Sequence, residues 1–353
     1  MELNSRKEKI LQAVVDTYIT NCEPISSVQI KDNYLPALSS ATIRNELAAL
    51  EELGYLTQPH ISSGRIPTAQ GYKMYVQKLM PKKKLTREEL DIIKRYFNSQ
   101  MLELDDILKN TAKVITEITN LTSVAYAQNF NDAIIQNIKI VKITEASALI
   151  IVVTDLGMLK NFTINIESNI TDDYCTKASN FISSVFNSYK ISQLSNPELI
   201  MIKVRKEYQK LFNTILKMLK DYQGDEFLSD FVLEGNSKIL DHKEYENVEK
   251  AKAMLQFLDA KHEIVPLLNS NGNVDINIQI GRDNEIKQGM PECAIVTASY
   301  NIKGHNIGSA GVVGPIRMDY AKVVSVLDYV TKIINHLPMS LNAASDVNED
   351  EKH

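Results

Sequence analysis

The chain has 353 residues, of which 44% are hydrophobic and 24% charged, and its formal net charge is −5. This size predicts two or three domains, and this composition excludes collagen-like, mucin-like and disordered proteins. The longest apolar run, Ala148–Val153, is far too short to cross a bilayer, and the first ten residues are charged. We therefore expect neither a membrane span nor a signal peptide. Three widely spaced cysteines without a CxxC pair predict a cytoplasmic protein with free, buried thiols and no zinc site.

Charge is distributed unevenly along the chain. Residues 1–84 contain 11 Lys and Arg against 8 Asp and Glu, whereas the remainder contains 28 against 36. Blocks of opposite sign favour a basic module that meets a polyanion and an acidic remainder that keeps the protein in solution. An excess of three charges is a modest signal, so whether this block binds nucleic acid depends on the pattern of residues inside it.

The basic block begins with three predicted helices. Ser5–Glu8 has the Ser-x-x-Glu form of a capping box, and apolar residues then recur at helical spacing up to Tyr18. A short helix over 26–33 follows a proline break. The third helix runs from a cap at Ser39 to Gly54.

The third helix has an outer face that suits the major groove of DNA. Ile43, Leu47 and Leu50 share one face, so at 100° per residue the opposite face carries Arg44 and Asn45 among alanines. Small residues allow close approach, hydroxyls at the helix N-terminus can meet phosphates, and Arg and Asn suit guanine and adenine edges. Taken alone, this pattern is explained about equally well by a merely solvent-exposed helix.

A β-ribbon after this helix favours the DNA-binding interpretation. Residues 55–60 and 66–68 are strand-like, and a fourth helix follows, which together are typical of a winged helix-turn-helix. The ribbon tip is rich in donors, its glycine lets the backbone approach a phosphate, and its arginine can reach the backbone or the minor groove. The residues that we expect to contact DNA are Ser40, Thr42, Arg44, Asn45, Ser62, Ser63, Gly64 and Arg65.

The rest of the chain alternates between strands and helices. Pro81–Lys84 and a capping box at Thr86–Glu89 mark a boundary. The elements expected beyond it are a helix over 105–119, a strand over 122–128, an antiparallel meander over 136–143, 148–154 and 158–166, helices around 178–185 and 208–219, a strand near Lys238, a helix over 248–258, a strand over 274–280, a hairpin of 292–302 with 307–316, and a final helix over 323–337.

No combination of residues indicates catalysis. Gly308, Gly311 and Gly314 lack the spacing of a nucleotide-binding turn, so a glycine-rich strand that packs closely on its neighbour is the better interpretation. The six histidines are scattered and no nucleophile or metal-ligand motif is present in the sequence. We expect a protein that is not an enzyme and that has no cofactor and no metal site.

Two stretches resemble the HrcA family, the heat-inducible transcription repressors of bacteria. One is SSATIRNELAALEELGYLTQPHISSGRIPTAQGYKMYV over 39–76, and the other is IGSAGVVGPIRMDY over 307–320. The resemblance implies an α+β multidomain fold with an inserted domain that combines a small antiparallel sheet with helices. Its parts are a winged helix-turn-helix DNA-binding domain over 1–85, a linker helix over 86–104, a GAF-like α/β domain over 105–133 and 229–340, an inserted dimerisation domain over 134–228, and a disordered tail over 341–353.

The resemblance also implies a function and partners. It implies a homodimer that binds the CIRCE inverted repeat of double-stranded DNA upstream of chaperonin and DnaK operons and is released on heat stress. A GroEL-type chaperonin is implied as the partner that keeps the repressor active. Two alternatives stay open: a winged-helix regulator that senses a small metabolite through the GAF-like domain, and a scaffold that does not bind DNA. A ligand effect without chaperonin favours the first, and the absence of salt-dependent DNA binding favours the second.

Overall fold

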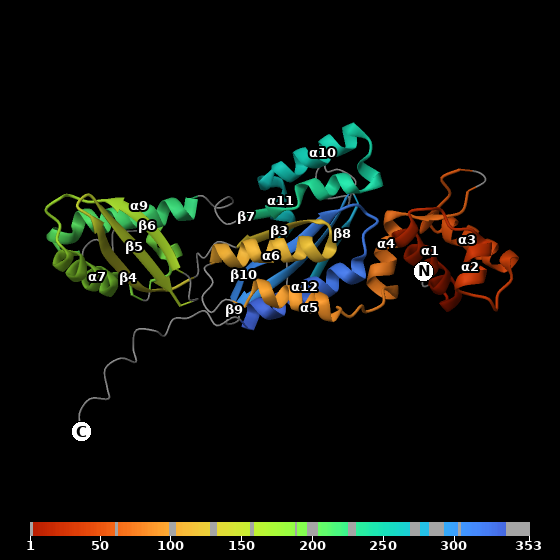
Figure 1. The fold of residues 1–353 in the computed structure, drawn as a ribbon, viewed down its shortest axis with the longest axis horizontal. Coiled ribbons are helices and arrows are strands. Elements are labelled where there is room, and N and C mark those ends of the chain that lie inside the picture. Colours follow the sequence, from red (N-terminus) through yellow and green to blue (C-terminus); the bar gives the residue numbers. More distant parts are fainter. Residues whose placement is uncertain are drawn as a thin grey trace, which may run out of the picture.

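The computed structural model describes residues 3–60, 63–98, 104–127, 133–155, 159–187, 189–195, 204–224, 231–268, 276–281, 293–302 and 305–336. Three parts follow one another along the long axis of the molecule (Figure 1). We call them the head (residues 3–80), the central domain (87–127 and 231–336) and the insert (133–224). Within these ranges no helix is both long and apolar enough to cross a membrane.

The head combines a helical core with a two-stranded ribbon. Its elements are α1 (Ser5–Asn21), α2 (Ser27–Asn33), α3 (Ser40–Glu52), β1 (Leu56–Thr57), β2 (Ile66–Pro67), α4 (Ala69–Met74) and the π-helix η1 (Tyr75–Leu79). The predicted order of helices and strands is confirmed. The predicted capping box at Ser5 is wrong, because Asn4 is the cap and its side chain accepts from the Lys7 amide. Asn and Ser cap helices about equally well, so the sequence alone does not choose between neighbours.

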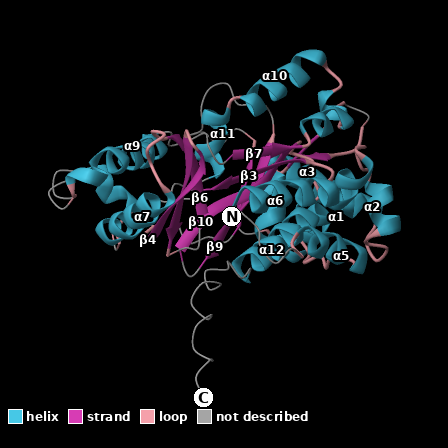
Figure 2. Ribbon diagram, turned by 60° about the vertical axis from the view of Figure 1, so that its left-hand side comes forward, coloured by secondary structure: helices cyan, strands magenta, loops and turns pink. Residues whose placement is uncertain are grey.

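The central domain is an antiparallel sheet covered by helices on both faces (Figure 2). Its strands lie in the order β7-β3-β10-β9-β8. Its elements are α5 (Arg87–Tyr96), α6 (Leu104–Thr119), β3 (Thr122–Ala127), β7 (Phe231–Glu234), η4 (Asn236–Asp241), η5 (Lys243–Tyr245), α10 (Val248–Asp259), α11 (Lys261–Leu268), β8 (Ile276–Ile280), β9 (Ala294–Ile302), β10 (His305–Gly314) and α12 (Tyr320–His336). Alternation along the strands buries Val313 towards α10 and α11, and Val312 towards α12, in separate apolar clusters.

Two details of the central domain concern glycines. The strand expected near Lys238 is wrong, because this residue lies in the 3₁₀ helix η4. Gly235, with φ of 75°, turns the chain directly after the short strand β7, so this strand ends before it reaches Lys238. Gly311 lies in β10, where a Cβ would come within 2.2 Å of the Val296 carbonyl oxygen in β9. The structure therefore agrees with the interpretation of the glycine series as a closely packed strand.

The insert is a three-stranded antiparallel sheet with helices on one face. Its elements are β4 (Ile135–Thr144), β5 (Ser147–Thr154), β6 (Leu159–Asn165), α7 (Asp172–Phe186), η2 (Ile191–Ser195), η3 (Lys206–Tyr208) and α9 (Gln209–Gly224). The strand order β4-β5-β6 confirms the predicted meander. The rings of Phe186 and Phe212 stack 4.9 Å apart and join α7 to α9. The amides of Ile138 and Ile140 donate to the hydroxyls of Ser183 and Ser179, each at 2.8 Å, so α7 covers the outer edge of β4.

Candidate nucleic-acid interface

The inner face of α3 packs against the core of the head. Ile43, Leu47 and Leu50 are 0%, 4% and 0% exposed. Glu46 adds a polar anchor, because its carboxylate pairs with Lys7 of α1 at 2.8 Å and with Arg6 at 3.5 Å. Both contacts hold α3 on α1 and neutralise a carboxylate close to the surface that we expect to meet DNA.

The outer face of α3 is exposed in the part of the chain that the structure describes. The exposed residues on this face are Ala41, Arg44, Asn45, Ala48 and Glu52. This set is the one that the helical period predicts, and the prediction of the exposed face is confirmed. Neither Arg44 nor Asn45 forms a hydrogen bond or an ion pair with another described residue. One guanidinium and one amide, flanked by alanines, are therefore available to an external partner.

The N-terminus of α3 is closed by its own hydroxyls. Ser39 is the cap, and its Oγ accepts a hydrogen bond from the Thr42 amide at 3.0 Å. The Oγ of Ser39 and the Oγ1 of Thr42 also lie 2.8 Å apart. Ser40 is half-buried in the first turn. Contacts of Ser40 and Thr42 with DNA stay a prediction, and the structure shows that the Thr42 hydroxyl already has a partner.

The wing is a short ribbon in which Leu56 pairs with Pro67 and Thr57 with Ile66. The hydroxyl of Ser63 stabilises the turn at the tip of the wing. It accepts a hydrogen bond from the His60 amide at 3.0 Å and donates one to the His60 carbonyl at 2.7 Å. Ser62 lies outside the described residues.

Gly64 and Arg65 hold the base of the wing against the head. The backbones of Arg65 and Ile25 exchange two hydrogen bonds, of 2.9 and 3.1 Å. A Cβ on Gly64 would lie 2.3 Å from the Ile25 carbonyl oxygen, so this backbone contact requires glycine. The Arg65 guanidinium pairs with the Glu51 carboxylate of α3 at 2.8 Å, and its side chain is only 19% exposed. Both residues therefore have a role within the fold, and their contacts with DNA stay a prediction.

The sequence interpretation missed Glu46 and Glu51, which position this surface. A weak signal for Glu51 is present in the sequence. Glu51 and Glu52 lie at the C-terminal end of α3, where the helix dipole disfavours negative charge. Such a placement indicates a basic partner, but it does not say which one. For Glu46 we find no local signal, because Arg6 and Lys7 lie 40 and 39 positions earlier.

The helical core of the head, its ribbon and the free outer face of α3 define a winged helix-turn-helix transcription regulator. Comparisons with known proteins identify the family. A family model described as the HrcA protein C terminal domain matches residues 105–324. The chain belongs to the HrcA family of heat-inducible transcription repressors.

Individual relatives cover almost the whole chain. The heat-inducible transcription repressor HrcA of Clostridium botulinum (strain Eklund 17B / Type B) is 37% identical over 340 residues, which are 96% of this chain and 98% of that protein. The protein of the same name from Clostridioides difficile (strain 630) is 35% identical and covers 95% of this chain and 99% of its own. A crystal structure of a hypothetical protein covers 95% of this chain and 98% of its own, with a TM-score of 0.65 at 20% identity, and so shares the fold.

These comparisons confirm three predictions: the family, the multidomain α+β fold and the role as a repressor of heat-shock transcription. HrcA repressors bind DNA, and the relatives carry the names of repressors and not of enzymes. Groups of three or more His, Cys, Asp and Glu that could hold a metal ion are absent from the described residues.

Proposed function

We propose that this protein represses heat-shock chaperone operons by binding the CIRCE inverted repeat as a homodimer, with α3 in the major groove. The free outer face of α3 is the observation that carries the proposal. Arg44 presents the donor fork that suits guanine, Asn45 the amide that suits adenine, and Ala41 and Ala48 leave room for the base edges. The amides of Ser40 and Ala41 in the first turn and the hydroxyls of Ser40 and Thr42 would meet phosphates, with Thr42 giving up its contact with Ser39.

The wing would hold the adjacent DNA backbone. Ser62, Ser63, Gly64 and Arg65 carry this part of the proposal, with Arg65 contributing only if its pair with Glu51 is exchanged for a phosphate. The hydroxyl and amide of Ser63 would likewise have to exchange their hydrogen bonds to His60 for phosphate oxygens. Phosphate contacts fix the register on the duplex and make the affinity depend on salt.

The domain boundaries form part of the same proposal. We keep a DNA-binding domain over 1–85, a linker helix over 86–104, a GAF-like domain over 105–133 and 229–340, and an inserted dimerisation domain over 134–228. The sheet order supports this division, because β3 and β7 are neighbours although β4, β5 and β6 lie between them in the sequence. The tail over 341–353 lies outside the described residues.

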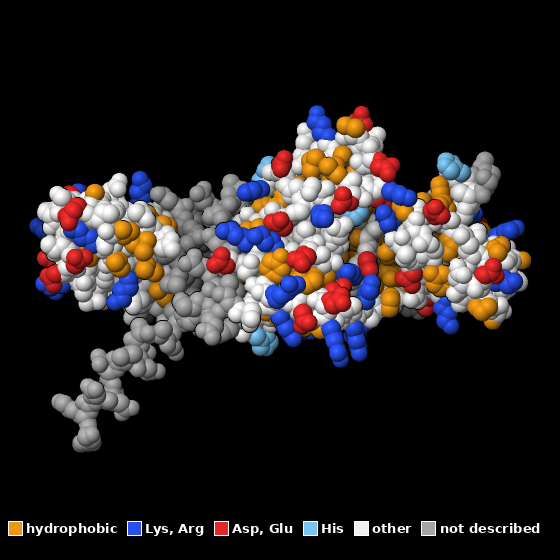
Figure 3. Space-filling model, viewed as in Figure 1, with side chains coloured by type: hydrophobic (Ala, Val, Ile, Leu, Met, Phe, Trp, Pro, Cys, Tyr) orange, Lys and Arg blue, Asp and Glu red, His pale blue; other side chains and the backbone are white. Residues whose placement is uncertain are grey.

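The homodimer would form through the uncovered face of the insert sheet. Val141 and Ile143 are 50% and 55% exposed on β4, and Leu149, directly opposite Val141, is half-buried on β5. Ile151 and Val153 continue the same face of β5. Figure 3 shows hydrophobic side chains gathered at this end of the molecule. Contiguous exposed aliphatic groups are typical of protein interfaces, and a second copy would cover them.

Two further parts of the proposal rest on the family, the second also on the three free cysteines. They are the GroEL-type chaperonin as the partner that keeps the repressor active, and a cytoplasmic location. Heat would release repression when unfolded proteins occupy the chaperonin.

The test of DNA recognition is binding of the full chain to a CIRCE duplex and to a scrambled duplex, at two salt concentrations, with and without chaperonin. We expect specific binding that weakens with salt and strengthens with chaperonin. Equal binding to both duplexes, or no binding in any condition, would refute the proposal. A metabolite that changes the affinity without chaperonin would instead support the ligand-controlled alternative.

The test of the dimer is sedimentation of Val141→Glu beside a matched surface change, Lys94→Glu on α5. A carboxylate in this interface would be desolvated at a cost that Lys139 on the same face only partly offsets, so we expect Val141→Glu to be a monomer and Lys94→Glu to remain a dimer. A dimeric Val141→Glu protein would place the interface elsewhere.

A further inference from the structure

Arg317 lies between β10 and α12 and reaches from the central domain into the head. Its Nη1 donates to the carbonyl oxygen of Ile19 at 3.0 Å, and its Nε donates to a Glu244 oxygen at 2.7 Å. Ile19 lies in the last turn of α1, where carbonyl groups have no amide partner within the helix. The planar guanidinium is suited to joining a carboxylate and a carbonyl in one geometry.

The burial and charges around Arg317 fit a rigid contact. Its side chain is 16% exposed and that of Glu244 is 30% exposed. Burial alone would raise the pKa of Glu244, but the hydrogen bond and the charge of Arg317 outweigh it and leave that pKa lowered. The pair is therefore charged at neutral pH, and each partner is satisfied by the other.

The residues that follow Arg317 also contact the head or the segment that leaves it. Asp319 pairs with Lys83 at 2.7 Å, and the ring of Tyr320 lies 5.9 Å from that of Tyr72 in α4. The hydroxyl of Ser325 in α12 donates to the carbonyl of Lys83. The stretch over 307–320 is one of the two that resemble the family, and it lies far from α3. Its last residues contact the head and the segment that follows it.

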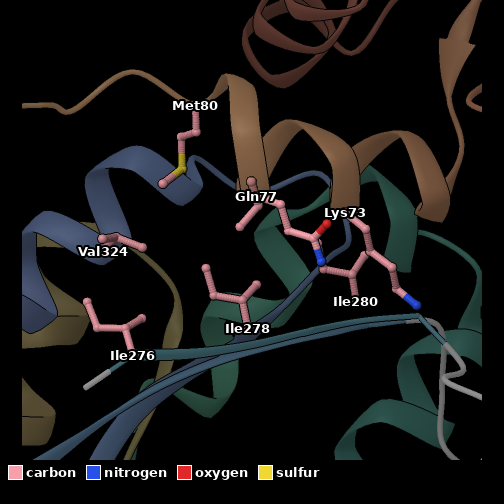
Figure 4. Close-up of a pocket in the computed structure, with 8 residues that line it drawn as sticks. Lys73, Gln77, Met80, Ile276, Ile278, Ile280 and Val324 are labelled. Carbon is pink, nitrogen blue, oxygen red and sulfur yellow. The ribbon is translucent and has the colours of Figure 1, made fainter. Parts of the chain in front are cut away.

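Part of the boundary between the head and the central domain is hollow. A cavity of about 350 Å³ separates the head from the edge strand β8 and from α12. Figure 4 shows Met80 and Gln77 of the head on one side of this space and Ile276, Ile278 and Ile280 of β8 on the other. Apolar packing is incomplete there, whereas Tyr72 and Tyr320 pack together elsewhere on the same boundary. The hydrogen bonds of Arg317 are directional, so they add a defined orientation to this apolar contact.

We propose that Arg317 fixes the orientation of the head and thereby sets the spacing between the two half-sites that the dimer accepts. This inference rests on the proposed function. Two heads on one dimer read two half-sites, and a rigid joint restricts the spacings at which both bind together. A joint held in advance also lowers the entropy that binding removes. Arg317 is a positioning residue, since it lies away from the outer face of α3.

The experiment compares Arg317→Gln with Arg87→Gln, an exposed arginine on α5, as the matched control. Affinity is measured for duplexes with different spacers and for a duplex with one half-site. We expect Arg317→Gln to lose about tenfold at the best spacer and to discriminate little between spacers. Its affinity for one half-site should stay within about twofold of the parent, because α3 is unchanged. Retained spacer preference, or equal loss on the single half-site, would overturn the proposal.

Two additions keep the test decisive. If Arg317→Gln unfolds, Glu244→Gln weakens the same joint, and it must give the same loss of spacer preference. Trypsin cleavage at Lys82–Lys84, exposed residues between the head and α5, reports the joint without DNA. We expect cleavage of Arg317→Gln to be faster by about tenfold. An unchanged cleavage rate would refute the rigid joint, whereas a parent protein that binds no duplex would refute the proposed function and leave the cleavage result standing.

Discussion

The hydroxyl of Tyr75 donates a hydrogen bond to Oδ1 of Asp16 at 2.6 Å and so joins the π-helix η1 to α1. Burial raises the pKa of Asp16, and this effect exceeds the opposing hydrogen bonds from Tyr75 and Gln12. The same contact and burial raise the pKa of Tyr75, which stays protonated. The head therefore contains a carboxylate whose charge is disfavoured by its surroundings.

Replacement of that carboxylate is expected to stabilise the protein at neutral pH. The folded pKa lies above the ordinary value of 3.8, so the contribution of Asp16 favours folding below that value and is lost as pH rises through the folded pKa. Asp16→Asn removes the charge and keeps an oxygen that can accept from Tyr75. We expect a higher Tm at pH 7 and no gain at pH 4 by calorimetry. The control is Asp91→Asn on exposed α5, and a lower Tm for Asp16→Asn at pH 7 would contradict the argument.

Arg44→Ala separates base recognition from mere attraction to DNA. If Arg44 reads a base, its loss costs about 1 to 3 kcal/mol and relaxes the preference at one operator position. If it contacts a phosphate, the loss is uniform across sequences and the salt dependence falls by about one counterion. We expect the first result from competition binding with single-base operator variants. Folding should be unaffected, because the side chain is exposed, and Lys9→Ala on the exposed side of α1 is the control.

Arg65→Ala is expected to lower the stability of the protein. The change leaves Glu51 without its partner at 2.8 Å and opens space beneath the wing, at a cost of about 1 kcal/mol. Glu51→Gln should give a similar fall in Tm, and Arg44→Ala should give none. An unchanged Tm for Arg65→Ala would show that the pair contributes little and that this guanidinium is available to DNA.

His242 provides a prediction about pH. Burial lowers its pKa, with Glu244 opposing and Arg317 adding to the effect, and its Nε2 has no partner among the described residues. The stability that the neutral ring contributes is present above pH 6.5, the ordinary value, and is lost as pH falls through the folded pKa. The loss is at most that of one proton, about 1.4 kcal/mol per pH unit.

The corresponding measurement is the Tm between pH 7 and pH 5 for the parent and for His242→Gln. We expect the parent to lose stability more steeply, since glutamine takes up no proton. The control is His262→Gln, because the His262 side chain is 76% exposed. If Tm falls equally steeply with pH in the parent and in His242→Gln, His242 is not the source of the pH dependence.

Periodicity predicted much of the candidate site, because it is a local property. The spacing of Ile43, Leu47 and Leu50 determines which side of α3 is buried, and therefore that Arg44 and Asn45 are exposed. Strand alternation predicted the meander of the insert for the same reason. The roles of DNA contacts remain predictions, since exposure shows availability and not the partner.

Partners that are distant in the sequence escaped prediction. Gly64 suits any tight turn, and only the position of Ile25 shows that it is required for a backbone contact. Arg317 lies 298 positions from Ile19, and no local pattern joins them. The strand expected near Lys238 was wrong because a single left-handed glycine, Gly235, redirected the chain.

The pairing of β3 with β10 has a consequence for synthesis. Ala127 lies opposite Gly308, so the centre of the sheet forms only when most of the chain has left the ribosome. The head precedes β10 in the chain, and its buried residues belong to an apolar cluster that continues into the central domain. Arg317 and Tyr320, which contact the head, are made after the head. A nascent chain therefore contains α3 before it contains the residues of the central domain that contact the head.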